Sequence, residues 1–182
     1  MRIAKLFTTV VLSFMLVSSF AQTDVFLKDY FFRWENSKKY LLAVAEAMPE
    51  SDYNFKPTDS EMTFAEQLVH ICVGIDWHAQ MLIRGRKEEE RPKEVREKMF
   101  NAVGKSKKEI VELIGKTFDE GTDVITKYDP AHLKDPITYV NKTRTKLQVF
   151  LLLSDHITHH RAQTLVYLRL KAIKPPEYSD YQ

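Results

Sequence analysis

Apolar residues recur at spacings of three and four over four long stretches of the chain, a pattern that predicts helices with one buried face. The stretches cover residues 24–48, 63–85, 106–128 and 145–172. Prolines follow the first, third and fourth stretches, and proline does not continue a helix. Four long helices joined by connections of unequal length predict an all-α chain that folds as an up-down four-helix bundle.

Two of these helices begin at a recognisable capping signal. Thr63 with Glu66, and Ser106 with Glu109, are Ser/Thr-x-x-Glu boxes whose side chains satisfy free backbone amides at a helix start. Gly74 lies inside the helix that begins at Thr63, where glycine costs about 1 kcal/mol relative to alanine. We therefore expect another backbone to come close at Gly74.

The connections between the helices differ in character. Residues 86–94, RKEEERPKE, form a run of charge, and we expect a solvated loop there, followed by a short helical piece near residues 95–103. The longer connection, residues 129–144, should contain an extended segment around Ile137 and Tyr139, with a turn at Asn141.

The fourth stretch is apolar on almost every side, which is typical of a helix in the interior of a bundle. Three histidines and a glutamine lie in its middle: His156, His159, His160 and Gln163. His156 and His160 are four residues apart and so lie on one helix face, in the HxxxH arrangement that can hold one metal ion. His159 points about 60° away from that face, and we expect Gln163 to contact bound water or substrate.

His70 is the one conspicuous polar side chain on the buried side of the second helix. Together with His156 and His160 it gives three imidazoles, which is the number of protein ligands in a catalytic zinc site with an open fourth position. The alternative is that each imidazole only satisfies a backbone carbonyl or a carboxylate in the core. Among charged neighbours, we expect Arg161 to reach solvent or an acidic residue, and Glu66 is a distant candidate for a general base.

Residues 1–21 have the features of a cleavable signal peptide. Arg2 and Lys5 give a positive start, residues 6–17 are mostly apolar, and Ser19-Phe20-Ala21 is a small-x-small cleavage site. The apolar run is shorter than the roughly 20 residues that span a bilayer. We therefore expect residues 22–182 to form the mature domain, exported to the periplasm or outside the cell without a stable membrane anchor; an uncleaved anchor is the alternative.

Charge and cysteine content narrow the classes of partner. Removing residues 1–21 takes two basic residues and no acidic one, so the 27 Lys and Arg fall to 25 and equal the 25 Asp and Glu. A neutral domain argues against nucleic acid as a partner, because phosphate binding needs an excess of basic residues. Cys72 is the only cysteine, which rules out an internal disulfide, and its apolar neighbours favour a buried thiol over a reactive one.

Three segments resemble the DinB/YfiT-like family of small four-helix metalloenzymes. They are MPESDYNFKP, FAEQLVHI and SDHITHHRAQTLVYLRLKAIKPPEY, and the resemblance covers about residues 24–178. It implies that His70, His156 and His160 are ligands of a divalent metal, often zinc or nickel. Ala162 and Ala172 stand where the family commonly has glycine, and the second change predicts a less sharply capped end of the last helix.

The resemblance also frames the expected function. Some relatives are transferases that use low-molecular-weight thiols, and others are isomerases of related chemistry. We therefore expect an exported, divalent-metal-dependent enzyme of transferase or hydrolase type that acts on a small molecule. A metal- or small-ligand-binding bundle without turnover is the second hypothesis. A homodimer is a further expectation, through the aromatic residues Tyr30, Phe31, Phe32 and Trp34, although burial of these rings in the core is the alternative.

Overall fold

The computed structural model describes the backbone of residues 2–182 and the side chains of residues 25–182. The predicted signal peptide, residues 1–21, lies outside the residues whose side chains are described, and its cleavage stays a prediction. Among the described residues, no helix combines the length and the apolar character that crossing a membrane requires.

The chain is mainly helical, with one small β-hairpin. The five α-helices are α1 (Arg2–Ala47), α2 (Phe64–Ile75), α3 (Lys93–Met99), α4 (Lys107–Thr126) and α5 (Lys146–Leu170). The hairpin consists of β1 (Pro136–Tyr139) and β2 (Lys142–Thr145). A π-helical segment, η2 (Asp76–Ile83), directly continues α2, and short 3₁₀ turns lie at η1 (Glu50–Asp52), η3 (Glu88–Glu90), η4 (Pro130–His132) and η5 (Tyr178–Tyr181).

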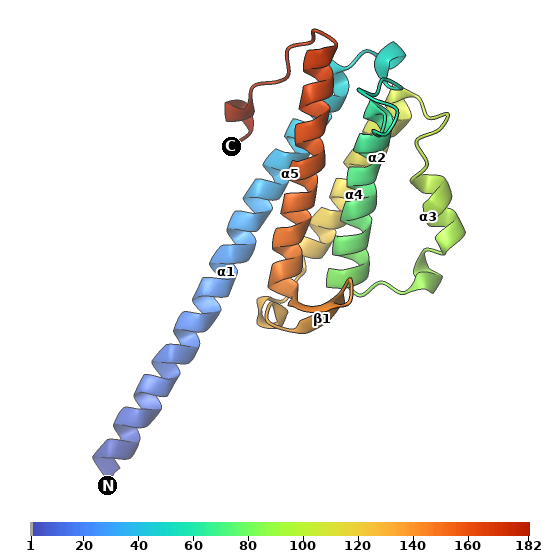
Figure 1. The fold of residues 1–182 in the computed structure, drawn as a ribbon. Helices are drawn as coiled ribbons and strands as arrows, with labels where there is room; N and C mark the ends of the chain where they lie inside the picture. Colours follow the sequence, from blue (N-terminus) through green and yellow to red (C-terminus); the bar gives the residue numbers. More distant parts are fainter. Residues whose placement is uncertain (1) are drawn as a thin grey trace.

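The four long helices pack against one another. Helix α2 packs against both α4 and α5, and α1 also packs against both of these helices, while the short α3 stands outside this group (Figure 1). Their shared core includes the fully buried rings of Phe64, Phe118 and Phe150. The prediction of a mainly helical chain is confirmed; the hairpin is a small departure from an all-α fold, in the segment where extended backbone was expected.

The helix starts agree with the capping signals in the sequence. Complete capping boxes are present at Thr63 and Ser106, and a third, between Thr145 and Gln148, begins α5. At its other end α5 terminates sharply, contrary to expectation. Ala172 adopts a positive φ of 58°, and the amides of Ala172 and Ile173 donate to the carbonyls of Arg169 and Leu168, so an alanine fills the place usually taken by glycine.

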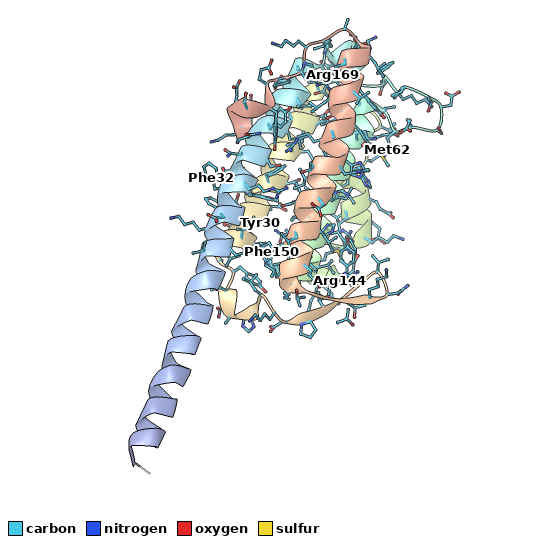
Figure 2. The ribbon with its side chains drawn as sticks, turned by 60° about the vertical axis from the view of Figure 1, so that its left-hand side comes forward. Tyr30, Phe32, Met62, Arg144, Phe150 and Arg169 are labelled. Atoms are coloured by element: carbon cyan, nitrogen blue, oxygen red, sulfur yellow. The ribbon has the colours of Figure 1, made fainter. Side chains whose placement is uncertain are left out.

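The aromatic residues of α1 divide between core and surface. Tyr30 and Trp34 are buried, and Tyr30 packs edge-on against Phe150 of α5. Phe32 is 62% exposed and points outward from α1 (Figure 2). The core explanation therefore holds for Tyr30 and Trp34, and Phe32 is left on the surface.

The charged connection after η2 is not simply solvated. Arg86 is buried and donates two hydrogen bonds, at 2.7 and 2.8 Å, to the carboxylate of Asp76, which is 1% exposed. Arg91 and Arg96 also reach that carboxylate, at 2.7 and 3.2 Å, and Arg91 continues to Glu120 on α4 at 2.8 Å. The expected solvated loop is wrong at these positions, because an unpredicted buried acid draws the arginines inward.

Candidate metal centre

The three histidines singled out in the sequence lie together between α2 and α5. His70 comes from α2, and His156 and His160 come from successive turns of α5, the helix that packs against it. One ligand atom from each lies within 4.8 Å of the other two, and Nε2 of His156 is 3.3 Å from Nε2 of His70. All three side chains are half-buried. The arrangement could hold a metal ion that is reached from solvent.

Gly74 makes room for one of these rings. A Cβ atom at this position would lie 2.2 Å from Cε1 and 2.3 Å from Nδ1 of His156. The close approach expected at Gly74 is therefore real, but its partner is an imidazole and not a backbone. Nδ1 of His156 is buried without a hydrogen-bond partner among the described residues.

His160 is held by a chain of hydrogen bonds that fixes which nitrogen carries its proton. Tyr167 donates its hydroxyl hydrogen to the carbonyl of Met62 at 2.8 Å, so the same oxygen can only accept from Nε2 of Gln67, at 3.5 Å. The carbonyl oxygen of Gln67 consequently faces His160 and accepts from its Nδ1–H at 2.8 Å. The lone pair of His160 is then on Nε2, free for a metal.

Burial keeps the three imidazoles neutral at neutral pH. Desolvation, with the neighbouring histidines adding to it, lowers the pKa of His156 to about 3 and that of His160 to about 4. Burial also lowers the pKa of His70. A metal ligand must be deprotonated, so this set meets a requirement of metal binding without competition from protons.

The simpler explanation, that each imidazole satisfies a carbonyl or a carboxylate, does not describe these three side chains. In the described part of the chain, His70 and His156 have only each other as hydrogen-bond partners, and His160 has the Gln67 amide. By contrast His78, also buried, accounts for both of its nitrogens, with the carbonyl of Gly74 at 2.7 Å and the Tyr139 hydroxyl at 3.1 Å. The donor set therefore fits a metal ion better than a core hydrogen-bond role.

Residues 33–164 match the family model described as the DinB superfamily. The chain belongs to the DinB superfamily. A DinB-like protein from Bacillus subtilis, YjoA, superposes with a TM-score of 0.65 at 18% identity, over 82% of this chain and 96% of that one. A DinB-like protein from Bacillus cereus ATCC 10987 gives 0.61 at 15% identity, over 84% and 94%. No match to a curated protein was found.

Other residues considered from the DinB-type sequence pattern lie away from the three ligands or are otherwise engaged. His159 is exposed, so it forms no hydrogen bond in the core, and its Nε2 accepts from the Gln163 amide at 3.1 Å. The Gln163 amide is paired with His159, and its contact with bound water or substrate stays a prediction. Glu66, the distant candidate for a general base, forms the capping box at the start of α2, where it accepts from the Thr63 amide at 2.7 Å. Arg161, expected at the surface, is buried against α1.

Gln67 is the site residue that the sequence analysis missed. It is 2% exposed and lies three residues before His70, which places the two side chains on neighbouring positions of one helix face. Gln67 could have been predicted from the sequence as a residue that orients a ligand, because it lies one turn from His70 and metal-bound histidines usually donate their second N–H to a fixed acceptor.

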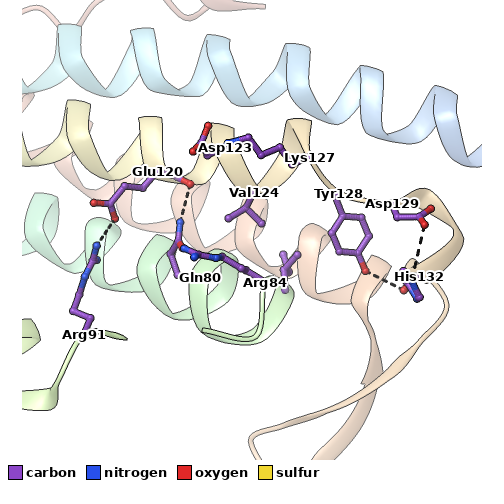
Figure 3. Close-up of a pocket in the computed structure, with 11 residues that line it drawn as sticks. Gln80, Arg84, Arg91, Glu120, Asp123, Val124, Lys127, Tyr128, Asp129 and His132 are labelled. Atoms are coloured by element: carbon purple, nitrogen blue, oxygen red, sulfur yellow. Dashed lines mark hydrogen bonds and ion pairs between the residues drawn. The ribbon is translucent and has the colours of Figure 1, made fainter. Parts of the chain in front are cut away.

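His70, His156 and His160 do not line any of the cavities described for this structure. One of about 600 Å³ lies between η2 and the second half of α4, where Gln80 donates to the carbonyl of Glu120 at 2.7 Å (Figure 3). Arg84 and Lys127 also line it, and none of the three histidines does.

Proposed function

We propose that this DinB-superfamily protein binds one divalent metal ion, zinc or nickel, through His70, His156 and His160. The observation that carries the proposal is the convergence of three neutral imidazoles from two helices, one of them held in its metal-binding tautomer by Gln67. In this account the four packed helices act as a rigid bundle that fixes the ligands before the metal arrives.

We further propose that the centre is catalytic, of transferase or hydrolase type, with a small molecule as substrate. Three protein ligands leave a coordination position through which the metal would act as a Lewis acid toward a substrate atom. The ring of His159 lies 4.8 Å from that of His160, and it is the exposed group best placed to take up a proton beside the site. A non-catalytic metal-binding bundle is the alternative, and it shares the same ligands.

Cobalt substitution separates these two functions. The Co²⁺-loaded protein should have a visible spectrum that changes when a small thiol or azide is added, because the open position accepts an outside ligand. The spectrum of a closed site would not change. A spectrum that both ligands leave unaltered at millimolar concentration would rule out the catalytic proposal while leaving metal binding intact.

Gln67→Leu should weaken metal binding by about 10–100-fold, the range for loss of a group that orients a metal-bound histidine. The substitution leaves Nδ1 of His160 without its acceptor and frees the ring to change tautomer. Gln163→Leu is the matched control, because Gln163 pairs with His159. Calorimetric titration with Zn²⁺ measures the metal affinity of both metal-free variants. Equal Zn²⁺ affinity in Gln67→Leu and Gln163→Leu would show that Gln67 has no orienting role.

Gly74→Ala should also weaken metal binding by about 10–100-fold, since the new methyl group occupies the space of the His156 ring and displaces it. Gly115→Ala in α4 is the matched control, because nothing lies within 4 Å of the added atom. There the helix should gain up to about 1 kcal/mol with no change in metal affinity. Unaltered Zn²⁺ affinity in Gly74→Ala would contradict the position assigned to His156.

Export completes the proposal. The charged start, apolar run and cleavage site of residues 1–21 support removal of this segment during secretion, so that the metal centre works outside the cytoplasm. We expect the exported protein to begin at Gln22, and mass spectrometry measures its N-terminus. Exported protein that still carries residues 1–21 would contradict this prediction.

A further inference from the structure

The C-terminal segment returns from the end of α5 to lie beside α1 (Figure 1). Tyr181 stacks on Tyr40 of α1 with ring centroids 4.8 Å apart, and the Tyr40 hydroxyl donates to the carbonyl of Pro176 at 3.3 Å. Two adjoining hollows of about 500 Å³ each remain between α1, α5 and this segment. They lie on a different side of α5 from the three histidines, and Tyr40, Thr158, Arg161 and Tyr178 line both.

A buried arginine forms the shared wall of these hollows. Arg161 is only 7% exposed, its guanidinium lies over the Tyr40 ring at 4.8 Å from the centroid, and Nη1 donates to Oγ of Ser37 at 2.7 Å. This is the one hydrogen bond from its side chain within the described part of the chain, out of five N–H groups that a guanidinium offers. The remaining donors have no acceptor among the side chains and backbone that the structure describes.

No carboxylate balances this buried charge. Arg161 forms no ion pair with any described acidic residue, although burying a charge is costly unless it is paired. The first hollow contains a second cation, Arg33, and no Asp or Glu. In the second hollow the one acidic residue, Glu177, is already paired with Lys174 at 2.7 Å. The side chains that line the two hollows therefore carry a net positive charge.

Exposed aromatic rings stand beside this charge. Phe32 is 62% exposed and Tyr178 is 56% exposed, and both line the first hollow. Large exposed rings next to a hollow offer apolar contact area for a planar ligand. A hollow of this size with one convergent charged group and aromatic walls has the character of a small-molecule site.

We propose that Arg161 anchors a second binding site, separate from the three histidines, for a small molecule that carries a carboxylate on an aromatic ring. The carboxylate accepts from the unused N–H groups of Arg161, and the ring packs against Tyr178 and Phe32. A single negative charge balances the single buried guanidinium.

Calorimetric titration of the full chain with benzoate tests the proposal, with benzamide as the neutral analogue of the same shape. Benzoate should bind, and benzamide should bind about tenfold more weakly or worse, because it loses the charge-assisted hydrogen bonds. Acetate should also bind more weakly than benzoate, because it lacks the ring. Equal affinity for benzoate and benzamide would overturn the proposal, as would acetate matching benzoate.

Variants locate the binding. Arg161→Gln should abolish benzoate binding, whereas Arg144→Gln, which removes an exposed arginine of β2, should leave it unchanged. His156→Ala must retain benzoate binding; loss there would mean that the carboxylate binds at the metal centre, and the second site would not exist. Because Arg161→Gln removes a buried group, wild-type crystals soaked with 4-iodobenzoate give an independent reading. Anomalous iodine density between Arg161 and Tyr178 supports the proposal, and its absence there overturns it.

Discussion

His156→Ala or His160→Ala should abolish binding of the divalent metal ion, whereas His159→Ala should leave it unchanged. Each of the first two substitutions removes one of three converging imidazoles, so the loss should exceed the about 10–100-fold cost of removing a supporting group. His159 sits between them in the sequence but is exposed and bonded to Gln163, so its loss removes no ligand. Metal content after dialysis and calorimetric titration with Zn²⁺ measure the three variants.

The comparison of neighbouring histidines makes this prediction specific. If metal were lost because any histidine on α5 is removed, or because the variants unfold, all three variants would lose it alike. Circular dichroism would detect unfolding. Metal loss in His159→Ala equal to that in His160→Ala would show that a different pair of histidines on α5 holds the ion. Retention of the metal in His156→Ala would remove that residue from the ligand set.

Asp76→Asn should destabilise the protein by about 3–5 kcal/mol, the cost of leaving a buried ion without its partner. Asp76 is 1% exposed and accepts from Arg86, Arg91 and Arg96. Arg91 also pairs with Glu120 and Arg96 with Glu88, whereas Asp76 is the one described ion-pair partner of Arg86. Without it Arg86, itself buried, has no counter-ion among the described residues, and the segment that contains Arg91 and Arg96 loses its ion pairs to Asp76. Urea unfolding followed by circular dichroism measures the free-energy difference.

Asp123→Asn is the matched control for the buried acid. Asp123 pairs with Lys127 at 3.0 Å on the exposed side of α4, and such pairs contribute about 0–1 kcal/mol. A stability loss in Asp76→Asn no greater than that of Asp123→Asn would contradict the structural role assigned to the ionic cluster.

Local chemistry made several features predictable from sequence. The capping boxes at Thr63 and Ser106 depend on residues three positions apart, and the HxxxH pair depends on residues four apart, so both can be read along one helix. The addition of His70 required only that its apolar neighbours place it inside the same core. The capping boxes are confirmed and the three histidines lie together, because each feature arises from one helix face and its burial; metal binding by these histidines stays a prediction.

Features that depend on contacts between distant segments were not predictable in this way. Gly74 identifies the position of a close approach but not the ring of His156 that makes it, 82 positions later in the chain. The run of residues 86–94 reads as solvated because nothing near it in sequence shows that Asp76 is buried and draws Arg86 inward. The prediction that Arg161 reaches solvent or an acidic residue is wrong for the same reason, since its partners Ser37 and Tyr40 belong to α1.

The two faces of α5 carry different chemistry in this account. His156 and His160 face α2 and supply two thirds of a metal centre, while Arg161, one residue further along, faces α1 and supplies the charge of an anion site. Adjacent residues on a helix point about 100° apart, so one segment serves both sites without their side chains meeting.

Elemental analysis of the purified wild-type protein, after reconstitution with Zn²⁺ or Ni²⁺ and removal of excess metal, tests the central claim most directly. The account predicts about one divalent ion per chain, held by the three histidines at neutral pH. Protein that retains no metal above the level of a His70→Ala, His156→Ala, His160→Ala triple variant would contradict it.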